Sequence, residues 1–249
     1  YRLAVNQYDH LAQFYRQAGQ QLAEQVLQLT PAEKQAILRF LAYNHRPENR
    51  YYAYDFFYDN CATRIRDLFE DQLPLAYPAD TSLANPPTLR QMLHEYVDQP
   101  MPWVGLGFDL VLGQPADKVA GFRTQMFLPD YLAQNLSDAT LGDRPLLGTP
   151  AIRVAGRPEK PSSFSILHPS LFIPLLCLLL VLGMGLAPPP WQRGIARGVV
   201  LLFGLAGIFL AFLWWGTDHG PVEQNWNLLW LNPLFPLIGL AGMIQNKKK

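Results

Sequence analysis

The sequence predicts a mostly helical α+β domain over residues 1–163, followed by a transmembrane region of three helices over residues 164–249. Charge distribution gives the first indication: residues 1–163 hold 15 of the 20 Lys and Arg and 18 of the 20 Asp and Glu, a net charge of −3. The second is a set of uncharged apolar stretches after Ser163, each near the ~20 residues that a helix needs to cross a bilayer. No basic face stands out, which argues against nucleic-acid binding.

The predicted membrane helices are residues 164–187, 198–216 and 226–244. The third is the weakest, because Asn and Pro residues interrupt its apolar pattern. It could instead be a re-entrant or interfacial segment, so a full crossing is one of two interpretations.

The loops between these stretches predict the orientation. The first loop, residues 188–197, carries two arginines and no acid, whereas the second, residues 217–225, carries Asp218 and Glu223 and no base. The tail ends in three lysines. Because basic loops stay in the cytoplasm, we expect the first loop and the C-terminus inside, and residues 1–163 and the 217–225 loop outside.

Apolar spacing predicts helices over residues 6–28 and 31–44 in the first domain. The second has a clear start, because Thr30 is a good N-cap and Glu33 completes a capping box. Further helices are predicted over residues 62–69 and 89–97. A short strand is predicted over residues 148–154.

One of the two cysteines stands at a chemically useful position. Cys177 lies inside a leucine-rich apolar stretch and is expected to be inert. Cys61 follows Asp59 and Asn60, either of which is a good N-cap, and so falls in the first turn of a helix. Free N–H groups there stabilise an anionic sulfur and an oxyanion. The alternatives are a small buried cysteine, or one paired with a cysteine outside this chain.

A cysteine nucleophile needs a base, which is usually histidine. His10 and His94 are expected at ordinary surface positions on helices, and His45 lies in a polar turn. His168 lies near the outer end of the first apolar stretch, and His219 lies in the outer loop. His219 could face a substrate at the interface, and the alternative is a solvated loop residue.

The run PENRYYAYDFFYDNCATRIRD, residues 47–67, closely resembles the Lnb-type N-terminal periplasmic domain of Gram-negative envelope proteins, a family named for a lipoprotein N-acyltransferase. Segments 127–132 and 225–233 also resemble that family. The resemblance implies a partial permuted papain-like (NlpC-like) fold in which the Asn60-Cys61 step carries the nucleophile, Cys61, with Asn60 supporting it. It also implies a catalytic histidine in a Gly-His-Thr strand before the cysteine. That motif is not in this sequence, so we expect it upstream of Tyr1.

The chemistry that the resemblance implies is thioester acyl transfer at the bacterial inner membrane, without a cofactor or metal. Cys61 would take an acyl chain from a phospholipid or lipoprotein ester and pass it to the N-terminal cysteine of a lipoprotein. Membrane lipids and lipoproteins are therefore the expected partners. Tyr54, with the two phenylalanines after it, could line an acyl groove or pack in the core. Arg64 and Arg66 could contact phosphate or form helix-surface salt bridges.

Two other functions use the same residues. A peptidase or amidase acting on peptide or cell-wall substrates would need the same nucleophile but a polar cleft in place of an apolar groove. In a non-catalytic envelope scaffold, Cys61 would be structural.

Overall fold

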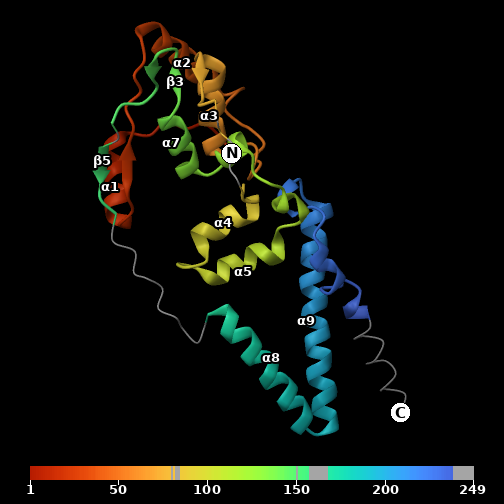
Figure 1. Ribbon diagram of the computed structural model, residues 1–249. Helices are drawn as coiled ribbons and strands as arrows, with labels where there is room; N and C mark the ends of the chain where they lie inside the picture. The colour runs from red at the N-terminus through yellow and green to blue at the C-terminus, as the bar shows by residue number, and fades with distance from the viewer. Residues whose placement is uncertain (80, 82–84, 150, 157–167, 238–249) are drawn as a thin grey trace. The chain divides into compact units, whose positions relative to one another are not determined.

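The computed structural model describes residues 1–79, 81, 85–149, 151–156 and 168–237 (Figure 1). The chain forms two compact units. The first, which we call the cysteine unit, comprises Tyr1–Pro87 and Val119–Lys160. The second, the membrane unit, comprises Thr88–Lys118 and Pro161–Lys249.

Helices make up most of the regular structure in the cysteine unit. In chain order they are α1 (Tyr8–Ala18), α2 (Pro31–Asn44), α3 (Cys61–Gln72), α6 (Phe122–Gln125) and α7 (Pro129–Ser137). Helix α3 packs against both α2 and α7. The core between them is aliphatic with one aromatic ring, Phe69; its most buried members are Leu146, Met126, Ala139, Ala62, Leu136 and Leu141. Burial of this core holds α3 in place, and with it the residue that begins the helix.

The strands of the cysteine unit are short and antiparallel. One pair is β1 (Leu22–Glu24) with β5 (Ala151–Val154). The second sheet has the order β2 (Leu75–Ala76), β3 (Thr140–Leu141), β4 (Arg144–Pro145). Gly142 allows the tight β3–β4 turn, because it adopts the left-handed φ of 61°. The unit is thus a mostly helical α+β structure, as predicted, while the papain-like arrangement stays a prediction.

The first predicted helix is wrong in its second half. Helix α1 ends at Ala18, because Gly19 takes a left-handed φ of 70° and its N–H bonds back to Arg16. The N–H of Gln20 then closes on the carbonyl of Tyr15, a common helix-ending pattern. The chain continues into β1, so tertiary pairing with β5 replaces the helix that residues 20–28 were predicted to form.

The other helix predictions for residues 1–163 are confirmed. Helix α2 begins with the predicted capping box, in which Thr30 N–H donates to the Glu33 carboxylate at 2.7 Å and Glu33 N–H donates to the Thr30 hydroxyl at 3.3 Å. Helix α4 spans Leu89–Val97, the predicted range. The predicted strand over residues 148–154 is present as β5 from Ala151, with Pro150 outside the described residues.

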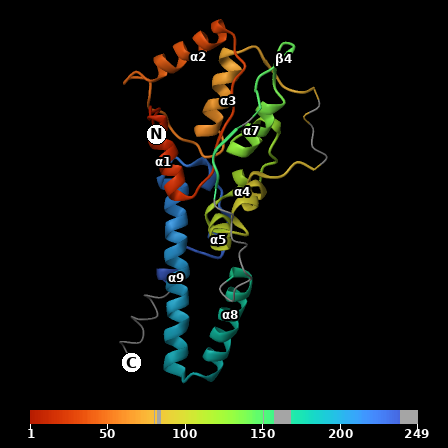
Figure 2. The same ribbon diagram turned by 90° about the vertical axis from the view of Figure 1, so that its left-hand side faces the viewer.

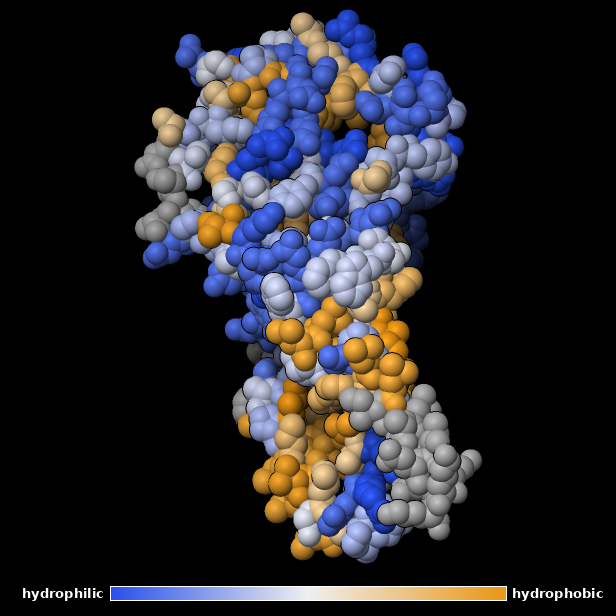
Figure 3. All heavy atoms as spheres, turned by 90° about the vertical axis from the view of Figure 1, so that its right-hand side faces the viewer, coloured by the Kyte–Doolittle hydropathy of each residue, from blue (hydrophilic) through white to orange (hydrophobic). Residues whose placement is uncertain are grey.

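The membrane unit combines two long apolar helices with a short helical segment from the middle of the chain. The apolar helices are α8 (Pro169–Leu186) and α9 (Pro189–Gly216), and each is long and apolar enough to cross a membrane. Figures 1 and 2 show them as a hairpin. In the space-filling view, hydrophobic side chains gather over this hairpin (Figure 3). The described residues therefore contain two candidate spans.

The predicted boundaries of the spans need two corrections. Helix α9 begins at Pro189, so the segment 188–197, which was predicted to be a loop, forms the first turns of this helix. Prolines are favourable in a first helical turn, and arginines are good helix formers that do not end a helix. The predicted third helix does not begin at Trp226. Residues 226–229 form the 3-10 turn η3, and helix resumes only at Phe235, after Asn232 and Pro233. The rest of that segment lies outside the described residues.

The middle segment of the membrane unit contains α4, α5 (Pro102–Val111) and η1 (Gln114–Asp117). The loop after α9 packs on the end of α5. The buried Asn225 side chain donates to the carbonyls of Leu110 and Val111 at 2.8 and 2.9 Å, and Gly113 N–H donates to the carbonyl of Pro221 at 2.9 Å. These bonds satisfy carbonyls that the end of a helix leaves free. They join segment 88–118 to the apolar helices in one unit.

Candidate functional site

Cys61 is the first residue of α3, and its side chain is exposed. The preceding Asn60 is the N-cap and is only 4% exposed. Its Oδ1 accepts the N–H groups of Ala62 and Thr63 at 2.8 and 3.0 Å. The Thr63 hydroxyl in turn accepts a hydrogen bond from the N–H of Asn60 at 2.8 Å. The helix start is therefore fixed by the residue next to the thiol, as the Asn60-Cys61 step predicts.

The amide nitrogen of Asn60 ties the same point to a second segment. Nδ2 donates to the carbonyl of Phe56 at 2.9 Å and to that of Phe127 at 2.8 Å. The side-chain oxygen and nitrogen of Asn60 are thus both occupied by hydrogen bonds. Asn60 therefore acts by holding the helix start at Cys61 in place. The capping also uses two of the N–H groups that could stabilise an oxyanion. Within the described residues, the N–H of Cys61 itself is the one left unbonded in this first turn.

A tight turn precedes the N-cap. The Asp55 carboxylate accepts the N–H groups of Phe57 and Tyr58 at 2.9 and 2.8 Å, and Asp55 and Asp59 pair through their backbones. The Phe57 ring is 1% exposed and meets Phe127 edge to face at 5.2 Å. Phe57 is thus a core residue, which was the alternative to its role in an acyl groove.

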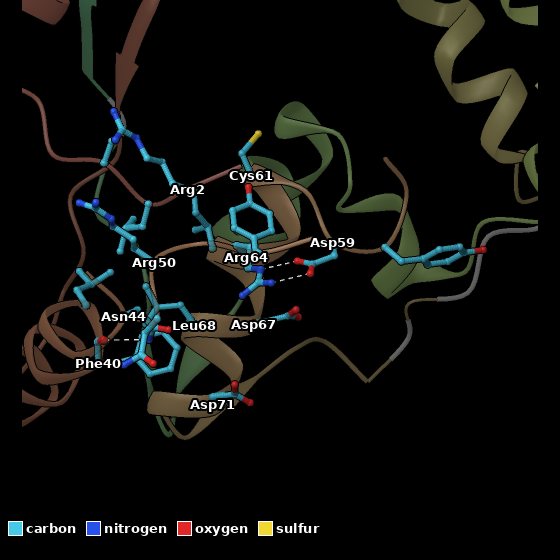
Figure 4. Close-up of a pocket in the computed structure, with 17 residues that line it drawn as sticks. Arg2, Phe40, Asn44, Arg50, Asp59, Cys61, Arg64, Asp67, Leu68 and Asp71 are labelled. Atoms are coloured by element: carbon cyan, nitrogen blue, oxygen red, sulfur yellow. Dashed lines mark hydrogen bonds and ion pairs between the residues drawn. The ribbon is translucent and has the colours of Figure 1, made fainter. Parts of the chain in front are cut away.

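A pocket of about 690 Å³ opens beside Cys61 (Figure 4). One part of its lining is apolar and comes from α2, α3 and the N-terminal segment: Leu3, Ala4, Phe40, Leu41, Ile65 and Leu68. The polar part includes arginine, asparagine, tyrosine and aspartate side chains. The cysteine is thus on the surface of a cavity with both an apolar and a charged side, which suits an amphiphilic ligand.

Two tyrosines lie close to the thiol. Burial, followed by the negative charge of Cys61, raises the pKa of both Tyr52 and Tyr54 above its ordinary value. Tyr52 lines the pocket, whereas Tyr54 stacks on Tyr1 at 4.0 Å between ring centroids. Tyr52, which was not predicted, therefore lines the pocket in place of the predicted Tyr54. The signal was available, because residues two apart on an extended segment share a face. A phenol that keeps its proton can donate a hydrogen bond to a substrate oxygen.

The two arginines of α3 have different roles. Arg64 lines the pocket, forms a bidentate ion pair with Asp59 and lies over the Tyr52 ring, with its Cζ 4.3 Å from the centroid. Arg66 is buried, pairs with Asp67 at 2.7 Å and donates to the carbonyl of Arg123 at 2.9 Å. Arg64 is therefore a pocket-lining residue held by Asp59, and Arg66 forms the structural salt bridge that was its alternative.

Within the described residues, no histidine lines the Cys61 pocket. His10 lies on α1 and His45 caps the end of α2. His168 is the N-cap of α8, where its Nδ1 is 2.8 Å from the Ser170 hydroxyl. His219 precedes η2 (Gly220–Val222) in the membrane unit. In the described part of the chain, no three His, Cys, Asp or Glu side chains are grouped as metal ligands would be.

His94 lies at a partly exposed position on α4, as predicted, but its two carboxylate partners were not predicted. Its Nδ1 lies 2.6 Å from Asp98 and its Nε2 lies 3.0 Å from Asp109, which joins α4 to α5. Because ionised carboxylates only accept, both ring nitrogens can donate only when the ring is protonated, so the two carboxylates favour the imidazolium form. Partial burial, the largest single effect, lowers the pKa of His94, but the two carboxylates outweigh it and raise the pKa above its ordinary value.

This cluster predicts a pH dependence of stability. A raised folded-state pKa gives stability that is complete below the ordinary histidine pKa of ~6.5 and is lost as pH rises through the folded value. We expect the α4–α5 pair to open more easily at pH 8.5 than at pH 6, by about 1 kcal/mol or less because the cluster is partly exposed. His94→Gln should remove this dependence and His10→Gln should keep it. Amide hydrogen exchange of α4, corrected for intrinsic rates, measures it; an unchanged dependence in His94→Gln contradicts the assignment.

Family comparisons agree with this arrangement of site and membrane helices. Residues 1–95, which include the Cys61 helix, match the Lnb N-terminal periplasmic domain. Residues 160–249, which include α8 and α9, match the Lnb transmembrane domain. No curated protein and no solved structure matches the chain. The chain therefore belongs to the Lnb-type family, as a membrane protein with a periplasmic portion that carries the Cys61 pocket and a transmembrane portion that follows it.

Proposed function

We propose that the protein is a membrane-anchored thiol acyltransferase of the bacterial envelope, with Cys61 as nucleophile and the N-terminal cysteine of lipoproteins as acyl acceptor. The observation that carries the proposal is the exposed Cys61 thiol at a fixed helix start, on a pocket with an apolar wall. An acyl chain can lie along that wall while its ester carbonyl reaches the sulfur. A purely polar cleft would have favoured a peptide substrate.

The reaction has two steps. In the first step the Cys61 thiol gives its proton to a base, and its sulfur attacks the ester carbonyl. A C–S bond forms and the ester C–O bond breaks. The leaving alkoxide then takes the proton from the base. The α-amino group of the acceptor then attacks the thioester; a C–N bond forms, the C–S bond breaks, and the ammonium proton returns through the base to the sulfur. The Cys61 N–H and the Tyr52 hydroxyl would stabilise the oxyanion of each step.

Position in the membrane supports the same proposal. We place residues 1–163 and the 217–225 loop in the periplasm and the C-terminus in the cytoplasm. Arg193 and Arg197 lie at the beginning of α9, and Asp218 and Glu223 follow its end, which fits the positive-inside rule. Acyl donor and lipoprotein are both held in the bilayer, so an anchored enzyme meets them at a raised effective concentration.

The test is acylation in a membrane that contains the protein, phospholipids and a lipoprotein with a free N-terminus. Mass spectrometry should show a hydroxylamine-labile acyl group on Cys61 and an amide-linked acyl group on the lipoprotein. Cys61→Ala should lower transfer at least about a thousand-fold, because no other group can replace a nucleophile. The matched control is Cys177→Ala in the membrane helix α8, which should transfer normally.

Unchanged acylation in Cys61→Ala would remove Cys61 from the mechanism. A peptidase would instead cleave peptide substrates in a Cys61-dependent way without acylating the lipoprotein. A scaffold would show neither reaction in the unaltered protein.

A further inference from the structure

Two arginines of the Cys61 pocket, Arg2 and Arg50, are held next to each other by backbone pairing. Residues 1–3 run antiparallel to residues 50–52, with Leu3 N–H donating to the carbonyl of Arg50 at 2.9 Å and Tyr52 N–H donating to that of Tyr1 at 3.2 Å. Figure 4 shows both guanidinium groups extending to the same side of the pocket. Two positive charges are thus placed together by the fold.

Neither charge is neutralised by a carboxylate within the described residues. Arg50 donates through Nη2 to the Tyr51 hydroxyl at 3.2 Å, and Arg2 contacts the same phenol. The hydrogen bond and charge of Arg50, followed by those of Arg2, lower the pKa of Tyr51. The Nε of Arg50 is buried and has no hydrogen-bond partner.

The other charged side chains that line the pocket are either paired within the protein or lie at its other end. Arg64 is paired with Asp59, and Asp67 is paired with Arg66 and Arg123. Asp71 lies on the same helix ten residues after Cys61, and Figure 4 shows it at the far end of the pocket. That separation is about 15 Å along a helix. The end of the pocket that contains Arg2 and Arg50 is therefore cationic.

A pair of guanidinium groups with free donors binds oxyanions such as phosphate, and the planar forks favour multidentate contacts. Leu3 and Ala4 continue from Arg2 into the apolar wall of the same pocket. A ligand that fits both features has an anionic head and an apolar tail. We propose that Arg2 and Arg50 bind the phosphate diester of a phospholipid, which makes a phospholipid the acyl donor. The donor role rests on the proposed function, whereas the phosphate site does not.

The cationic end can be tested on the thiol itself, without catalysis. In a Cys177→Ala background, Cys61 is modified with an anionic and a cationic methanethiosulfonate of similar size, and the ratio of their rates is measured. Arg2→Gln or Arg50→Gln should lower the anionic-to-cationic ratio roughly two- to five-fold each, as expected for a charge about 10 Å away in solvent. The control is Arg46→Gln, because Arg46 lies over the Tyr43 ring and does not line the pocket. An unchanged ratio in both pocket variants would overturn the site.

The ligand is tested by protection of Cys61 from the neutral reagent N-ethylmaleimide. Dihexanoylphosphatidylglycerol should slow alkylation, neutral dihexanoylglycerol should not, and the protection should be lost in the Arg2→Gln/Arg50→Gln double variant. Unchanged hydrogen exchange of the α3 amides in that variant shows that it is folded, and protection is expressed relative to each variant's own alkylation rate without lipid. Equal protection by the neutral lipid would overturn the proposal, and protection by inorganic phosphate alone would overturn its lipid part. Protection without acyl transfer would contradict the proposed function and leave the phosphate site standing.

Discussion

Replacing Asn60 by alanine is expected to destabilise α3 by about 3–5 kcal/mol. The variant loses the cap of the helix, which costs about 1 kcal/mol. It also leaves the buried carbonyl of Phe127 without its donor, at about 1–3 kcal/mol, and the partly buried carbonyl of Phe56, at about 1 kcal/mol. Hydrogen exchange of the α3 amides in the full chain measures the opening free energy directly.

Two further variants separate the parts of this effect. Asn60→Asp keeps an acceptor for the N–H groups of Ala62 and Thr63, but it loses both donated bonds and sets a carboxylate against two carbonyl oxygens, so it should cost at least as much as Asn60→Ala. Asn49→Ala is the matched control, because Asn49 makes one exposed hydrogen bond, at 3.1 Å to the carbonyl of Tyr43. It should cost about 1 kcal/mol or less. Equal costs for Asn60→Ala and Asn49→Ala would contradict the role given to Asn60.

Replacing Arg66 by methionine is expected to cost about 2–3 kcal/mol. Its side chain is 4% exposed and interacts with Asp67, Glu70 and the carbonyl of Arg123. Breaking a buried pair from one side typically costs 3–5 kcal/mol. The cost is smaller here because the Arg123 side chain also pairs with both carboxylates. Hydrogen exchange of α3 and α7 is again the measurement.

The control for this variant lies two residues earlier on the same helix. The Arg64 side chain is 46% exposed, so its pair with Asp59 is solvated and Arg64→Met should cost about 1 kcal/mol or less. If the two arginines contribute equally to stability, the distinction between a structural Arg66 and a pocket-lining Arg64 is wrong.

Local signals were enough to predict the start of α3 and the whole of α2. A cap binds N–H groups two or three residues away, so Thr30 with Glu33 and Asn60 before Cys61 can be recognised in a short window. Long apolar runs likewise predicted the two spans. The predicted end of α1 was wrong, because the apolar pattern that continues past Gly19 was given more weight than the glycine, which is a local stop signal. Only the pairing with β5 shows that the following residues form a strand.

The sequence by itself determined that a thiol begins a helix in one part of the chain and that apolar helices follow it, because capping and hydrophobicity act between near neighbours. Only the tertiary structure decided which residues surround that thiol. Arg2 meets Arg50 through a backbone pairing across nearly fifty residues, and His94 meets Asp109 across fifteen. Segment 88–118 joined the apolar helices through Asn225, more than a hundred residues away. Such contacts depend on how the chain packs, and no local pattern encodes them.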